Sequence, residues 1–153
     1  ILVLFAGDTK NKSYTKLVRD KIEQNNLERV CKILGSVNQD EMRSLYQIAD
    51  LSLSFPLRAE GFGRTVSESL YSNTSVLAFD YGGVKNQLAN LSDMFKVKPQ
   101  DYQVLPKKIE KLLSLSEDQK KEAIEGVQSV IESNFSKINM VNQYLKLYES
   151  LKS

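Results

Sequence analysis

The chain contains no histidine, and it has a single cysteine among its 153 residues. The absence of histidine excludes histidine-based catalytic triads and histidine-ligated metal sites within these residues. One cysteine cannot form an internal disulfide, which is typical of a reducing compartment, and the apolar neighbours of Cys31 favour a place in a buried strand. No apolar run approaches the roughly 20 residues that a membrane-spanning helix needs. Neither sign of charge dominates, because 21 basic and 19 acidic residues leave a net charge of +2, so charge does not favour nucleic acid as a partner.

The composition is that of one globular domain. Hydrophobic residues make up 41% of the chain and charged residues 26%, and 153 residues suffice to bury a core. The chain begins at Ile1 rather than at methionine, and its first six residues already read as a strand. We therefore expect residues 1–153 to form a single lobe of a longer, two-lobe polypeptide.

Short apolar runs alternate with amphipathic segments along the first two thirds of the chain. The apolar runs, which predict strands covered on both faces, are residues 1–6, 30–34, 51–55, 75–79 and 94–97. Helices are predicted between them, one of them begun by Asn38 or Asp40 as a cap. Three polar helices with apolar stripes are predicted after Pro99, over residues 101–115, 116–133 and 136–151. This alternation predicts an α/β fold with a mostly parallel sheet.

The most informative segment runs from Glu60 to Glu68 and reads Glu-Gly-Phe-Gly-Arg-Thr-Val-Ser-Glu. It follows a predicted strand and leads into a predicted helix, which is an arrangement that can hold an anion. Carboxylates repel phosphate, so the two glutamates are better suited to neutral hydroxyls. The segment therefore predicts a ligand with both phosphates and hydroxyls, such as a nucleotide sugar.

Each of these residues also has a purely structural interpretation. Thr65 and Glu68 have the spacing of a capping box, in which the acid satisfies backbone donors at a helix start. Glu60 alone could be a solvated loop acid, and the glycines could serve turns. Arg58 and Arg64 could reach a phosphate, although arginines near an exposed loop are more often solvated.

The combination resembles the retaining glycosyltransferases of family 4, whose GT-B fold has two Rossmann-like lobes. The family motif is a glutamate, seven residues and a second glutamate, which here stand as Glu60 and Glu68. The resemblance extends upstream to Phe5-Ala6-Gly7-Asp8 and Leu45-Tyr46-x-x-Ala49-Asp50-Leu51, and downstream to residues 75–84 and Gln87-Leu88. It implies a Rossmann-like three-layer lobe with a mostly parallel sheet, the C-terminal, donor-binding half of a GT-B fold.

The resemblance implies a role for each residue of the motif. Glu60 would bind hydroxyls of the donor sugar beside the leaving diphosphate and is the predicted catalytic residue. Glu68 would bind the ribose hydroxyls. The remaining predicted donor-binding residues are Gly61, Phe62, Gly63, Arg64, Thr65 and Val66, with Gly82 and Gly83 near the sugar or phosphate and Ser36 and Val37 beside the base. Gly82 and Gly83 could equally form a tight turn between a strand and a helix.

The family reaction transfers a sugar from a nucleoside-diphosphate donor to an acceptor hydroxyl with retained anomeric configuration. The resemblance implies no cofactor and no metal, and the chain lacks an Asp-x-Asp motif. It implies a cytoplasmic enzyme of surface polysaccharide or glycolipid synthesis that does not bind nucleic acid. The acceptor saccharide or glycolipid would be bound by an N-terminal lobe outside residues 1–153, through which the enzyme could contact the inner face of the membrane.

The chain departs from the family pattern in several places. An arginine and a lysine that clamp the diphosphate, and the central strand before them, would precede Ile1, so we expect these residues alone to be inactive and to bind the donor weakly. Asn73 and Ser75 stand where the family often has glycine and proline, and Asn86 stands where it often has a glutamate that helps organise the site.

Two other functions fit the same fold. A nucleotide-sugar epimerase would use carboxylates and histidines from two lobes, and this chain has no histidine. A non-catalytic, nucleotide-binding regulatory module would need a phosphoacceptor at the carboxyl end of a strand. Asp8 has that position but lacks an acidic neighbour, and Asp50 stands at the start of a strand.

Overall fold

The computed structural model describes residues 1–151, without the side chain of Gln128. These residues are α/β in composition, and every strand pairing is parallel, as the sequence predicts. The strands form two sheets, with the orders β1-β2 and β3-β4-β5. The sheets belong to two compact units, Ile1–Leu45 and the residues from Tyr46 onward. It remains a prediction that both units belong to one lobe. It also remains a prediction that the central strand of that lobe is absent from these residues.

The first unit contains β1 (Val3–Ala6), α1 (Lys12–Gln24), β2 (Cys31–Gly35) and most of α2 (Gln39–Ile48). Val3 pairs with Cys31 and Ala6 with Gly35, with one register shift between Phe5 and Ala6. Cys31 lies in β2, as predicted. Its side chain is half-buried, and no residue of this unit is fully buried.

The start of α2 follows from a pair of side-chain caps. The Asn38 side chain accepts a hydrogen bond from the backbone N–H of Glu41 at 2.9 Å, and the Glu41 carboxylate accepts one from the N–H of Asn38 at 2.7 Å. Both bonds satisfy donors that a helix start leaves without partners. The prediction of Asn38 as a cap is therefore confirmed.

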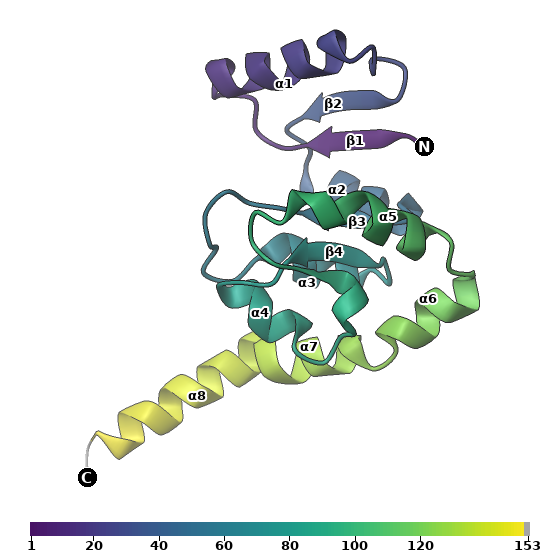
Figure 1. The fold of residues 1–153 in the computed structure, drawn as a ribbon. Helices are drawn as coiled ribbons and strands as arrows, with labels where there is room; N and C mark the ends of the chain where they lie inside the picture. The colour runs from purple at the N-terminus through teal and green to yellow at the C-terminus, as the bar shows by residue number, and fades with distance from the viewer. Residues whose placement is uncertain (152–153) are drawn as a thin grey trace. The chain divides into compact units, whose positions relative to one another are not determined.

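The second unit is built on β3 (Ser52–Ser54), β4 (Val76–Phe79) and β5 (Lys96–Val97). All four residues of the central strand β4 are buried. Helices α3 (Arg64–Tyr71), α4 (Gly83–Leu88) and α5 (Leu105–Leu113) cover this sheet (Figure 1). The largest side chains of its core are Phe79, Phe95, Leu70, Leu77, Leu88 and Leu112. These buried apolar groups supply the main driving force for folding of this unit.

The C-terminal helices are α6 (Glu117–Ile124), α7 (Val127–Phe135) and α8 (Lys137–Ser150). The single helix predicted over 116–133 is wrong, because Gly126 adopts the left-handed conformation (φ 75°) and separates α6 from α7. A glycine takes this conformation readily, which the apolar periodicity does not reveal. Helix α8 projects from α7 and has no buried residue (Figure 1). Among the described helices, none is long and apolar enough to cross a membrane.

Candidate active site

The loop between β3 and α3 places the Glu60 motif at the carboxyl end of β3, where ligands bind in open α/β sheets. Gly63 is buried, has φ 83° and occupies the N-cap of α3. No side chain caps this helix, so the capping-box interpretation of Thr65 and Glu68 is wrong. Backbone donors at such a helix start, together with the helix dipole, favour an anion.

The turn before α4 packs directly on this loop. The N–H of Gly83 donates to the carbonyl of Glu60 at 3.0 Å. A Cβ on Gly82 would lie 2.6 Å from the Glu60 carbonyl oxygen, and one on Gly83 would lie 2.1 Å from that of Gly61. Real Cβ atoms do not come so close to backbone, so two glycines are required here. The structure thus brings together the two loops that the sequence singles out.

A residue without a predicted role, Gln87, fixes the two loops to each other. Its side-chain amide donates to the carbonyl of Phe62 and, at 3.4 Å, to that of Gly63. Gln87 is 3% exposed, and its Oε1 has no hydrogen-bond partner among the described residues. The sequence indicates such a role only in that Gln87 is a polar residue on the face of α4 that also carries the buried Val84 and Leu88.

The Glu60 side chain is exposed and lies over the start of α3. Its Oε2 is 3.6 Å from the position of a Cβ on Gly63, the N-cap of that helix. Within the described part of the chain, no side chain or backbone donor pairs with this carboxylate. The Glu60 carboxylate can therefore accept hydrogen bonds from a ligand at this helix start.

The Glu68 carboxylate lies one helical turn further along α3 and has partners from the protein. Its Oε1 accepts from Nη2 of Arg64 at 2.7 Å and from Nε of Arg64 at 3.1 Å. The Arg64 side chain is 76% exposed, so this pair contributes little to stability. Arg64 thus faces Glu68 in this structure, and not a separate phosphate site.

These two glutamates, the intervening loop and the Gly82-Gly83 turn lie around one helix start, and the comparisons give this arrangement its context. Residues 1–128 match the family described as glycosyl transferases group 1. The chain belongs to this family. A D-inositol 3-phosphate glycosyltransferase of Corynebacterium urealyticum is 27% identical over 136 residues, which are 89% of this chain and 31% of that protein.

Solved structures of glycosyltransferases share the fold. A glycosyltransferase of Rickettsia africae matches with a TM-score of 0.87 and 26% identity, over 100% of this chain and 41% of that one. The Anabaena protein HepE, crystallised with UDP and glucose, matches with a TM-score of 0.82 and 22% identity, over 97% of this chain and 40% of that one. The chain therefore has the Rossmann-like fold of one GT-B lobe, and it spans about a third to two fifths of the length of these proteins.

Two predicted site residues of this group 1 family member belong to the first unit. Ser36 and Val37 follow β2 in the first unit, where Ser36 is exposed and Val37 half-buried. Arg58 and Asn86 are exposed. The nucleotide-binding role of Ser36 and Val37 remains a prediction.

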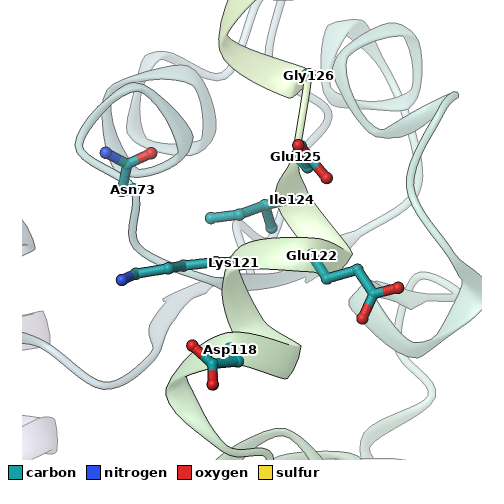
Figure 2. Close-up of a pocket in the computed structure, with 7 residues that line it drawn as sticks. All are labelled: Asn73, Asp118, Lys121, Glu122, Ile124, Glu125 and Gly126. Atoms are coloured by element: carbon teal, nitrogen blue, oxygen red, sulfur yellow. The ribbon is translucent and has the colours of Figure 1, made fainter.

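A hollow of about 440 Å³ lies between Asn73, in the turn before β4, and helix α6. Figure 2 shows the residues that line it, which are Asn73, Asp118, Lys121, Glu122, Ile124, Glu125 and Gly126. Lys121 and Glu122 point in opposite directions from α6 (Figure 2). None of the residues predicted to bind the donor lines this hollow, so we do not assign it to the site.

Tyr46 of α2 is a buried tyrosine near Glu68, and its pKa is raised. Burial first, and then the nearby negative charge of Glu68, raises the pKa of Tyr46 to about 12. Because the pKa of Tyr46 is about 10 in the unfolded chain and about 12 in the folded protein, the folded state holds this proton more tightly. The resulting contribution to the free energy of unfolding is complete below about pH 10 and is lost as the pH rises toward 12.

We expect the free energy of unfolding of the wild type to fall more steeply than that of Tyr46→Phe as the pH rises from about 10 to about 12. Urea denaturation at a series of pH values measures both slopes. Tyr144→Phe, which alters an exposed tyrosine of α8, is the control and should behave as wild type. Parallel slopes for wild type and Tyr46→Phe would show that Tyr46 titrates normally.

Proposed function

We propose that the chain is the donor-binding lobe of a retaining glycosyltransferase, which transfers a sugar from a nucleoside-diphosphate sugar to an acceptor hydroxyl. The observation that carries this proposal is the packing of the Glu60 loop on the Gly82-Gly83 turn at the start of α3. Family membership supports it, and favours a transferase over an epimerase or a regulatory module.

In this proposal the diphosphate lies at the start of α3. The bond between the anomeric carbon and the diphosphate oxygen breaks, and its electron pair leaves with the diphosphate. The acceptor oxygen bonds to the anomeric carbon, and the proton of the acceptor hydroxyl passes to the departing diphosphate. The backbone N–H groups around Gly63, Arg64 and Thr65 and the positive end of the α3 dipole stabilise the developing charge. Glu60, at 3.6 Å from the Gly63 Cβ position, is close enough to bind hydroxyls of the same sugar.

Glu68 binds the ribose hydroxyls, with Arg64 holding its carboxylate in place. A carboxylate accepts two hydroxyl hydrogen bonds well, and its charge strengthens them. The proposed reaction requires no cofactor beside the donor and the acceptor. The larger part of the acceptor, a saccharide or glycolipid, contacts residues outside this chain, and the lobe works in the cytoplasm, where nucleotide sugars are substrates.

The proposal predicts that UDP raises the melting temperature of the intact protein and that Glu68→Ala loses most of this increase. A ligand at a hundred times its dissociation constant stabilises the folded protein by about 2.7 kcal/mol. Loss of the contact between Glu68 and the ribose lowers the affinity for UDP and so reduces this stabilisation. Differential scanning fluorimetry with UDP, GDP and ADP measures the effect. UDP comes first because HepE was crystallised with UDP.

Glu110→Ala, which removes an exposed glutamate of α5, is the matched control and should keep the full increase. The melting temperatures without nucleotide separate a binding defect from a folding defect. An equal response of Glu68→Ala and Glu110→Ala would overturn the role of Glu68. If no nucleoside diphosphate raises the melting temperature of the wild type, the proposed function itself fails.

A further inference from the structure

An uncharged pocket of about 300 Å³ opens at the carboxyl ends of the three-stranded sheet. Its wall is formed by Pro56 and Leu57 after β3, Phe79 and Tyr81 at the end of β4, and Pro99, Gln100 and Tyr102 after β5. Every lining residue is neutral. The pocket lies on the same edge of the sheet as the Glu60 loop, and no role predicted from the sequence uses it.

The aromatic wall of this pocket is fixed by packing. The rings of Phe79 and Tyr81 meet edge to face with centroids 6.0 Å apart, and those of Phe79 and Tyr102 with centroids 5.7 Å apart. The Tyr81 hydroxyl donates to the carbonyl of Pro56 at 2.6 Å. This bond joins the segments after β3 and β4, so the wall is preformed and a ligand need not order it.

The pocket lies next to the proposed donor site along the chain and in space. Tyr81 directly precedes Gly82, and a Cβ on Gly82 would lie 2.6 Å from the Glu60 carbonyl oxygen and 3.2 Å from Cβ of Ala59. From α3 toward Tyr81, the order is therefore the helix start, the Glu60 loop, the Gly82 turn and the aromatic pocket. If the donor sugar lies at Glu60, the pocket borders the Gly82 turn that packs on the loop holding this sugar.

We propose that this pocket is a subsite for one sugar ring of the acceptor. The inference rests on the proposed function, because it takes the Glu60 loop as the place of the donor sugar. A volume of about 300 Å³ is at the lower end of small-molecule sites and suits a single ring. Tyr102 is 49% exposed and Leu57 75% exposed, so both offer apolar surface to a ligand.

The chemistry of the lining favours a neutral sugar over a phosphate or a hydrocarbon. A phosphate buried beside seven neutral residues would lack the positive partner that an anion needs. A hydrocarbon would make no use of the Gln100 amide, which is exposed and lines the pocket. A pyranose places its C–H face on the Tyr102 ring and its hydroxyls within reach of Gln100, which satisfies both kinds of surface.

Saturation-transfer NMR on the intact protein tests the proposal, with and without saturating UDP. The probes are methyl pyranosides of glucose, galactose, mannose and N-acetylglucosamine, with cyclohexanol as a ring of similar size without the sugar hydroxyls. We expect at least one pyranoside to give a signal that falls about threefold or more in Tyr102→Ala. Tyr144→Ala, a tyrosine of α8 that is 54% exposed and does not line the pocket, should keep the signal.

Leu57→Asp gives a second variant whose exposed position tolerates the change, and it should lose the signal as well. Tyr102→Phe should retain most of it, because the aromatic face remains. A signal that persists in both Tyr102→Ala and Leu57→Asp, a signal from cyclohexanol alone, or no signal from any pyranoside would overturn the subsite. The UDP-induced rise in melting temperature is measured on the same samples, so a failure of the donor site is seen separately.

Discussion

Replacing Glu60 with alanine should lower the turnover of the intact protein roughly tenfold or more while leaving its melting temperature unchanged. Glu60 is exposed and its side chain has no partner among the described residues, so the side chain contributes little to folding. Its carboxylate nevertheless stands over the start of α3, where the leaving diphosphate is proposed to lie. Loss of the side chain therefore removes a contact to the reacting sugar and leaves the protein intact.

Release of UDP from the nucleotide sugar that best stabilises the protein measures this turnover. Glu60→Gln separates charge from hydrogen bonding, because it keeps an acceptor of similar shape without the negative charge. Glu125→Ala, an exposed glutamate at the end of α6, is the control and should turn over as wild type. A folded Glu60→Ala protein with undiminished turnover would refute the assignment of Glu60.

The order of strands and α-helices up to α5, the loop that carries Glu60 and the helix that carries Glu68 could be predicted from the sequence. Short apolar runs such as 75–79 have few alternatives to a buried strand, and β4 covers Val76–Phe79 of that run. The position of Glu60 after β3 follows from this order alone, because loops at the carboxyl ends of parallel strands share one edge. The sequence therefore predicts that the loops after β3 and β4 lie at one edge of the sheet, and their role in binding a donor stays a prediction.

The contacts that join these loops could not be predicted, because they depend on residues far apart in sequence. Gln87 reaches the carbonyl of Phe62, and Tyr81 reaches that of Pro56, each across 25 positions. Local spacing also misled at Thr65 and Glu68, whose capping-box pattern is overridden by Gly63 as the N-cap. The break at Gly126 was missed since a left-handed glycine leaves the apolar period on both sides intact.

We expect Gly83→Ala to destabilise the protein by about 3 kcal/mol and to weaken UDP binding. Gly83 is the first residue of α4, where alanine would otherwise favour the helix by at most about 1 kcal/mol. The new Cβ would lie 2.1 Å from the carbonyl oxygen of Gly61 and 2.7 Å from Cα of Phe62. Both contacts are with backbone, so no side-chain rotation relieves them, and the clash outweighs the gain in helix propensity.

The two loops must then move apart, which breaks the hydrogen bond from Gly83 to the Glu60 carbonyl and shifts the Glu60 carboxylate from the start of α3. Urea denaturation measures the loss of stability, and calorimetric titration with UDP measures the loss of affinity. Gly61→Ala is the matched control for stability, because a Cβ there would meet no atom within 4 Å. Equal stability of Gly83→Ala and Gly61→Ala would mean that the turn and the loop do not pack together, and the donor site built on their contact would lose its basis.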